Sequence, residues 1–390
     1  MRTGKILATA LICMISAVCA DAKIKILYGP YLQNVKADEA TIVWESDTVS
    51  VGWVEIAPDD GTHFYSEERT KYFDTTNGVK NASTVHTVKI EGLQPATTYR
   101  YRIYSKEILS HKGTKVIYGD VAATNVFRKQ PLKFTTSDYT KDAVSFVMLN
   151  DIHGRSDLIP KLLGLAAYDD KDFVVFNGDM VSSFADKKSV FEGFMNTSVE
   201  LFASQKPMYY ARGNHETRGE FATSFQEYFS PEEPHLYYVF RQGPACFIVL
   251  DTGEDKPDSD IEYSGITDYD NYRTQQQKWL ESLSDNKLVT GAKYRIVIAH
   301  MPPSRSKDIW HGQKEVLEKF VPALNSLGVD LMLCAHLHRN VYEEAGDIIK
   351  FPVVVNSNES VLAADITQEG IDISITGLDG KNKFRKTFAK

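Results

Sequence analysis

The sequence predicts an α/β domain preceded by an all-β segment, and two patterns support this. From residue 141 onward, short apolar runs alternate with stretches in which apolar residues recur at helical spacing. Between residues 23 and 138, short runs rich in β-branched and aromatic residues are separated by turn residues. With 390 residues, the chain is long enough for two domains. We therefore expect a leader at 1–22, a β-sandwich at 23–138 and an α/β domain at 141–390.

The first part of the chain has the composition of a signal peptide. Arg2 and Lys5 precede an apolar stretch at 6–18, and small residues suited to cleavage follow it. The stretch is shorter than the ~20 residues that span a bilayer. The alternative is a lipid-modified Cys19, which is disfavoured because Val18 is bulky where such sites require a small residue. We expect an exported protein, secreted or periplasmic, without a membrane span.

The segment 23–138 has the pattern of a β-sandwich. Residues 40–44 and 51–56 are rich in β-branched residues, and the Pro-Asp-Asp-Gly sequence at 58–61 predicts a turn after them. Residues 92–102 give the sharpest local signal, because a Gly-Leu-Gln-Pro turn leads into Tyr99 and an alternating strand. This stretch resembles the tyrosine corner of a fibronectin type III domain, in which the tyrosine hydroxyl bonds back to an upstream backbone group.

In the α/β part, each of five short apolar runs ends in residues that can bind metal ions. Runs at 146–149, 173–176, 208–212, 296–299 and 331–334 are followed by Asn150-Asp151-Ile152-His153, Asn177-Gly178-Asp179, Gly213-Asn214-His215-Glu216, His300 and Ala335-His336-Leu337-His338. Such runs are typical of buried strands, and the loops at their carboxyl ends form the binding sites of α/β proteins. We expect helices at 158–167, 187–204, 274–283 and 313–327, and later strands at 348–355, 361–366 and 371–375.

Seven side chains in these blocks are candidate metal ligands: Asp151, His153, Asp179, Asn214, His300, His336 and His338. Seven ligands exceed the four or so that one zinc-like ion takes. We therefore predict two ions that share Asp179, because Gly178 before it allows a close approach. Imidazole, carboxylate and amide oxygen suit iron, zinc or manganese, as divalent or mixed-valence ions. Paired ions ~3.5–4 Å apart are a recurring device for phosphoester displacement.

The five blocks also carry a family resemblance. Asp-x-His, Gly-Asp, Gly-Asn-His-Glu, a lone His and His-x-His occur in the order found in the calcineurin-like metallophosphoesterase superfamily, which residues 143–356 resemble. The resemblance implies a catalytic domain built as a two-sheet sandwich flanked by helices. The Gly-Pro-Tyr-Leu-Gln sequence at 29–33 and the strand containing Trp44 resemble the N-terminal domain of purple acid phosphatases. A purple acid phosphatase-like layout is therefore implied as well.

The resemblance implies a role for each candidate. The first metal would be held by Asp151, His153, Asp179 and His338, and the second by Asp179, Asn214, His300 and His336. His215 matches the family's catalytic histidine, which steadies the phosphate and helps to protonate the leaving oxygen. The nucleophile would be a hydroxide that bridges the metals and attacks phosphorus in line.

Two positions depart from the family pattern. Ala335 stands where a glycine usually precedes the last block, which puts the shape of that loop in question but not its ligands. Ser182 stands where purple acid phosphatases carry a tyrosine ligand, and His153 takes up that vacancy. We therefore expect no tyrosinate colour.

We expect an enzyme that hydrolyses a small phosphorylated substrate, with phosphomonoesters favoured by the purple acid phosphatase-like layout. A phosphodiesterase of the same fold is the first alternative, and the five blocks do not separate the two. An alternative of another class is a non-catalytic surface-binding protein with a vestigial metal site, but the complete ligand set and His215 speak against it. The formal charge of −8, about −10 once Arg2 and Lys5 are removed, argues against nucleic acid as a partner.

Several histidines and cysteines stand outside the five blocks. We interpret four histidines that match no motif as surface or packing residues: His63, His86, His111 and His235. His311 lies between the fourth and fifth blocks and is a candidate for substrate binding. Cys246 and Cys334 lie within apolar strands, where buried free thiols are common, and a bridge between them stays open.

Overall fold

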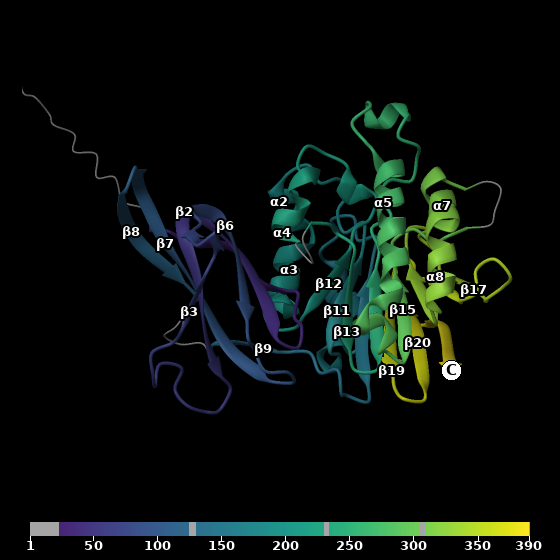
Figure 1. The fold of residues 1–390 in the computed structure, drawn as a ribbon, viewed down its shortest axis with the longest axis horizontal. Coiled ribbons are helices and arrows are strands. Elements are labelled where there is room, and N and C mark those ends of the chain that lie inside the picture. Colours follow the sequence, from purple (N-terminus) through teal and green to yellow (C-terminus); the bar gives the residue numbers. More distant parts are fainter. Residues whose placement is uncertain (1–22, 125–129, 230–233, 305–308, 390) are drawn as a thin grey trace, which may run out of the picture.

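The computed structural model describes residues 23–124, 130–229, 234–304 and 309–389. The predicted signal peptide at 1–22 lies outside the described residues. An N-terminal β unit is followed by a larger unit in which helices cover two β-sheets (Figure 1). Within the described ranges, no helix is long and apolar enough to cross a membrane.

The N-terminal unit is organised around one long strand, β2 (Glu39–Pro58), which includes both strands predicted at 40–44 and 51–56. The first half of β2 pairs with β1 (Ile26–Gln33) and β6 (Ser83–Glu91), and the second half pairs with β3 (Lys71–Phe73) and β7 (Thr98–Lys112). β8 (Lys115–Ala123) and β9 (Leu132–Thr135) pair with β7, whereas β4 (Thr75–Thr76) and β5 (Val79–Lys80) form a separate ribbon. Because β2 belongs to both groups of strands, the two groups enclose a single core around Trp44.

The tyrosine-corner contact is present in this unit. The hydroxyl oxygen of Tyr99 accepts a hydrogen bond from the backbone N–H of Gln94 at 2.9 Å. The turn before β7 is therefore tied to the strand that follows it, as the sequence pattern predicted.

The larger unit contains two six-stranded mixed sheets, which confirms the predicted fold class. The first has the order β12-β11-β10-β19-β20-β21, formed by Met208–Ala211, Phe173–Asn177, Val144–Leu149, Ser360–Ile366, Gly370–Gly377 and Asn382–Ala389. The second has the order β13-β14-β15-β16-β18-β17, formed by Tyr238–Gln242, Ala245–Val249, Tyr294–Ile298, Leu331–Cys334, Val353–Val355 and Val341–Glu343. A core that contains Phe146, Phe247 and Ile296 joins the two sheets, so they pack face to face.

Helices cover the outer faces of both sheets (Figure 1). On the first sheet lie α1 (Leu158–Leu165) and a helical stretch made of α2 (Lys187–Val190), α3 (Asn196–Ser198) and wide π-type turns at Phe191–Met195 and Val199–Ala203. On the second lie α5 (Tyr269–Ser282), α6 (Lys287–Thr290), α7 (His311–Glu315) and α8 (Val321–Leu327). α4 (Phe225–Tyr228) follows the third ligand loop. The four predicted helices are therefore found, although α5 begins at Tyr269 rather than at 274.

One predicted strand is wrong in extent. Of residues 348–355, only β18 (Val353–Val355) is a strand. Pro352 has no N–H with which to extend the ladder, and Ile348 is exposed. The strands at 361–366 and 371–375 are confirmed as β19 and β20.

The N-terminal unit packs against the helical stretch over the first sheet. The rings of Tyr28 and Phe191 stack with centroids 3.9 Å apart. The Tyr31 hydroxyl donates to the carbonyl of Tyr228 at 3.0 Å, and the Tyr101 hydroxyl donates to that of Ser204 at 2.6 Å. These contacts make the N-terminal unit a packing partner of the helices that cover β10 to β12.

Candidate metal centre

The seven predicted ligands and His215 lie in five loops at one edge of the two sheets. Asp151 and His153 follow β10, Asp179 follows β11, Asn214 and His215 follow β12, His300 follows β15, and His336 and His338 follow β16. The strands run parallel within each set, so their carboxyl ends lie at the same edge. The ligand atoms form three overlapping groups, each within 4.8 Å: Asp151 with His153 and His338, Asp179 with His300 and His336, and His153 with Asp179 and His215.

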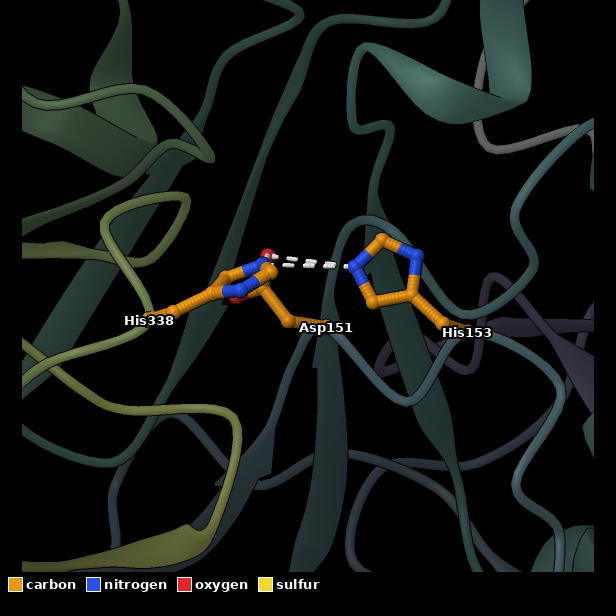
Figure 2. A group of neighbouring side chains, drawn as sticks. All are labelled: Asp151, His153 and His338. Atoms are coloured by element: carbon orange, nitrogen blue, oxygen red, sulfur yellow. Dashed lines mark hydrogen bonds and ion pairs between the residues drawn. The ribbon is translucent and has the colours of Figure 1, made fainter.

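The first group places two imidazoles against one carboxylate oxygen (Figure 2). Nε2 of His338 is 3.1 Å from Oδ1 of Asp151 and 3.3 Å from Nε2 of His153. The other oxygen of Asp151, Oδ2, accepts hydrogen bonds from Asn150 Nδ2 at 2.7 Å and from the His336 N–H at 3.2 Å. Oδ1 therefore faces the two imidazoles. When both histidines are neutral, this oxygen and the two Nε2 atoms each direct a lone pair at the same point, which is the arrangement that a cation requires.

The second group is built on Asp179 and His300. Oδ2 of Asp179 is 3.1 Å from Nε2 of His300, and both residues are buried. Nδ1 of His300 donates to the carbonyl oxygen of Asn177 at 2.7 Å, so Nε2 carries the free lone pair of the neutral ring. The side-chain oxygen of Asn214 lies 3.1 Å from Nδ1 of His336.

The Asn214 amide tests whether a cation fits this group. Its oxygen lies 3.2 Å from His300 Nε2 and 3.3 Å from Asp179 Oδ2, which are both acceptors when His300 is neutral. Its nitrogen lies 3.1 Å from a donor, Nη2 of Arg218. With His300 neutral and no cation bound, the reversed amide would satisfy these contacts better. With a cation between them, the inward oxygen becomes a ligand, so this set of oxygen and imidazole donors fits a divalent metal ion.

Asp179 lies between the two groups. Its Oδ1 accepts the backbone N–H of His215 at 2.9 Å, and its Oδ2 faces His300 at 3.1 Å and His215 Nε2 at 3.9 Å. The same carboxylate is grouped with His153 on one side and with His336 on the other. This position suits a ligand shared by two ions.

The ligand loops have backbone conformations that most residues avoid. Five candidates have positive φ: Asp151 (52°), His153 (51°), Asp179 (54°), His336 (71°) and His338 (51°). Such strain costs on the order of 1–3 kcal/mol per residue and is concentrated at functional sites. Gly178 has a φ of 79°, and a β-carbon there would lie 2.4 Å from His300 Nδ1, so the predicted close approach is real. Ala335 is not among the described residues with positive φ, so its methyl group is tolerated.

A buried carboxylate that the sequence analysis left without a role holds two of these loops together. Oε2 of Glu216 accepts the N–H groups of Asp179 at 2.8 Å and Gly213 at 3.0 Å. Its Oε1 accepts the N–H of Met180 at 2.7 Å, that of Val181 at 3.4 Å and the Tyr210 hydroxyl at 2.8 Å. Burial and the nearby Asp179 raise the pKa of Glu216, but these five donors favour its charged form. Glu216 is part of the Gly-Asn-His-Glu block, but the motif does not reveal what it contacts.

His215 has one ring nitrogen fixed and the other presented to the site. Nδ1 is 2.7 Å from the carbonyl oxygen of Ser182, to which it donates. Nε2 therefore faces the ligand groups, and the side chain is 29% exposed, which leaves it within reach of a bound molecule. Ser182 thus orients this histidine through its backbone carbonyl.

The charges of the site determine where protons reside in the metal-free protein. Burial lowers the pKa of His300, but the Asp179 carboxylate outweighs it and raises that pKa to about 10. Burial raises the pKa of Asp179, but His300 and His215 hold it well below its usual range. Burial, helped by His300, lowers the pKa of His336 to about 4. A metal ion must therefore displace a proton from His300, whereas His336 is already neutral.

A second charged network, also missed from the sequence, lies beside Asn214. Arg218 donates to both oxygens of Glu254, at 2.8 and 2.9 Å, and Thr217 donates to Glu254 Oε1 at 2.7 Å. Glu254 is buried in the long connection between β14 and α5. This connection therefore fixes the short helical turn that follows Asn214.

His311 lies at the start of α7, apart from the three ligand groups. Its Nε2 is 2.7 Å from Oδ1 of Asp270, and Glu315 lies close by. Arg273 and Lys319 already pair with these carboxylates, so the cluster is neutralised by protein cations. The structure therefore gives His311 a charged protein partner, and its role in substrate binding stays a prediction.

In the part of the chain that the structure describes, the remaining histidines and cysteines do not belong to any of the three ligand groups. His86 is buried, with Nε2 2.7 Å from Ser50 Oγ, and His235 stacks on Tyr237 with centroids 3.9 Å apart. His63 accepts a turn N–H from Tyr65, and His111 is exposed on β7. Cys246 and Cys334 are buried and free, so the bridge left open by the sequence is not formed.

Comparisons with known proteins agree with this architecture. Residues 144–340 match the family described as calcineurin-like phosphoesterase, and residues 29–118 match the purple acid phosphatase N-terminal domain. A purple acid phosphatase from seeds of yellow lupin (Lupinus luteus) is similar in structure, with a TM-score of 0.61 and 16% identity over 92% of this chain and 74% of that one. The protein TT1561 of Thermus thermophilus gives a TM-score of 0.41 and 15% identity over 63% of this chain and 99% of that one. The search of curated proteins found no match.

Proposed function

Since the chain belongs to the calcineurin-like phosphoesterase family and carries a purple acid phosphatase N-terminal domain, it is a metal-dependent phosphoesterase, and we propose that it is an exported phosphomonoesterase with two metal ions. The observation that carries this proposal is the convergence of five strand-end loops on one cluster of imidazole, carboxylate and amide groups. Their chemistry suits iron, zinc or manganese.

Two ions are proposed because the candidate ligands fall into two sets that meet at Asp179. The first ion would take Asp151, His153, Asp179 and His338, and the second would take Asp179, Asn214, His300 and His336. The 3.1 Å contacts of Asp151 with His338 and of Asp179 with His300 supply a carboxylate–imidazole pair for each ion. When bound, such a pair of ions would offset the charge of a phosphate group and activate the water that attacks phosphorus.

His215 is proposed as the general acid. Its Nδ1 proton is held by the Ser182 carbonyl, so Nε2 is the atom that can carry a transferable proton to the leaving oxygen. This Nε2 lies 3.9 Å from Asp179 Oδ2, so it is beside the proposed bridging carboxylate. An alkoxide leaving group needs such a proton, because it is a strong base.

The preference for monoesters rests on the purple acid phosphatase-like layout, and export rests on the signal-peptide pattern of residues 1–22. Initial rates on matched phosphomonoesters and phosphodiesters, measured after reconstitution with defined metals, test the first point. We expect monoesters to exceed diesters by at least about tenfold in kcat/KM, with no hydrolysis by the metal-free protein. Exposed His63, outside every ligand group, supplies a control variant, His63→Ala, that should match the wild type. A diester preference would replace the proposal by a phosphodiesterase.

A further inference from the structure

The Asn214 side-chain amide lies between the second ligand group and the guanidinium of Arg218. One of its two terminal atoms is 3.2 Å from His300 Nε2, 3.3 Å from Asp179 Oδ2 and 3.1 Å from His336 Nδ1. The other terminal atom is 3.1 Å from Nη2 of Arg218. Asn214 is buried, so these contacts define the surroundings of its amide.

The two sides of this amide make opposite demands on it. An amide has one acceptor atom, its oxygen, and one donor group, its NH2. A guanidinium only donates hydrogen bonds and keeps its charge, so Arg218 favours the amide oxygen on its own side. A cation in the second ligand group requires the oxygen on the opposite side. The NH2 group then faces Nη2 of Arg218 at 3.1 Å, donor against donor.

The protein holds both partners of this contact in place. Nε and Nη2 of Arg218 donate to the two oxygens of Glu254 at 2.8 and 2.9 Å. Glu254 is buried and also accepts the Tyr263 hydroxyl at 2.7 Å. On the other side, the Thr217 hydroxyl donates to the backbone carbonyl of Asn214 at 2.7 Å. The guanidinium therefore cannot move away from the amide without breaking a bidentate ion pair to a buried carboxylate.

We propose that Arg218 weakens the binding of the second metal ion by competing with it for the Asn214 oxygen. The inference rests on the proposed function, which supplies the second ion, and it makes Arg218 a positioning residue that acts through the amide. A hydrogen bond from a charged donor is worth roughly tenfold or more in an equilibrium constant. The second ion is therefore held less tightly than its ligands alone allow, and the occupancy of that site follows the metal concentration around the protein.

A substitution that keeps the charge of Arg218 but removes its planar fork tests this inference. Metal-free protein is titrated with manganese in a calorimeter, which gives a dissociation constant for each of two ions. Lysine can still pair with Glu254 but cannot reach the amide as well, so we expect Arg218→Lys to lower one constant about tenfold and to change the other by less than about twofold. Arg100→Lys, the same change in an ion-paired arginine on β7 of the N-terminal unit, should change neither constant.

The variant Asn214→Asp separates competition for the amide oxygen from a general effect of charge or folding. A carboxylate has an acceptor on both sides, so it can bind the metal ion and accept from Arg218 at the same time. In the Asn214→Asp background, Arg218→Lys should therefore leave the affected dissociation constant unchanged or raise it. A general effect of charge or folding would lower this constant in both backgrounds.

The readout is metal affinity, so it is independent of hydrolysis. If the dissociation constants follow the expected pattern but no phosphoester is hydrolysed, the inference is retained and the proposed function is rejected. An unchanged or raised constant in Arg218→Lys would overturn the inference. A fall of the same size in the Asn214→Asp background would overturn it as well, because Arg218 would then act without the amide.

Discussion

The Glu216 carboxylate is the contact on which the shape of the ligand loops depends most. It accepts four backbone N–H groups, from Asp179, Gly213, Met180 and Val181, and the Tyr210 hydroxyl. In Glu216→Gln, one carboxylate oxygen becomes an amide NH2 group. Each oxygen accepts at least two hydrogen bonds, so at least two donors then face another donor. An unsatisfied buried donor costs about 1–3 kcal/mol, so the free energy of unfolding should fall by about 2–6 kcal/mol.

Guanidinium denaturation of the metal-free protein measures this loss without a contribution from metal binding. Because Asp179 loses its backbone support, metal content per chain, measured by elemental analysis, should fall as well. Glu192→Gln is the matched control, since Glu192 is exposed and lies 3.8 Å from Lys188, and it should change stability by less than about 0.5 kcal/mol. A loss below about 1 kcal/mol in Glu216→Gln, with full metal content, would refute the role assigned to this network.

Four further predictions concern the metals and the proton donor. Asp179→Asn removes the negative charge that both ligand groups share, so elemental analysis should find less than one metal ion per chain. Retention of two ions would exclude Asp179 as the bridging ligand. His215→Ala should keep its metals while kcat falls roughly 10²–10⁴-fold, and loss of metal would identify His215 as a ligand. Iron-loaded protein should be nearly colourless because Ser182 supplies no phenolate, and a visible absorption band would place another tyrosine at the metal. In the metal-free protein, the His300 pKa is raised from 6.5 to about 10, so its stabilising contribution is full below pH 6.5 and is lost as the pH rises through 10. Metal binding at pH 7 should therefore release at least one proton, measured by calorimetry in two buffers, and release of none would contradict this pKa.

The sequence predicted the strands before the ligand loops because buried parallel strands are continuous apolar runs. Phe173 to Phe176 is such a run, and it forms most of β11. The polar residues after each run identify the loops, and parallel pairing brings the loops to one edge. The fold class and the neighbourhood of the candidate ligands could therefore be predicted from local patterns.

Other features depend on contacts between distant residues, so the sequence did not predict them. β2 continues through residues 45–50, where Glu45 and Ser50 each pair with a strand on both sides, and no local pattern shows this. β21 is an edge strand in which Phe384 and Phe388 are separated by polar and charged residues, so it lacks an apolar run. The partners of Glu216 and Arg218 belong to other loops, and only the folded chain brings them together. Aspartate and histidine adopt positive φ more readily than most residues, but nothing in the sequence marks which of them do so in the ligand loops.

The dependence of phosphomonoester hydrolysis on metal stoichiometry tests the central claim most directly. Metal-free protein would be titrated with zinc or manganese, and the initial rate on 4-nitrophenyl phosphate would be followed against bound ions per chain. Two sets of ligands that share Asp179 predict a rate that keeps rising through the second equivalent and saturates at two ions per chain. Saturation at one ion, or hydrolysis that persists without metal, would contradict the account.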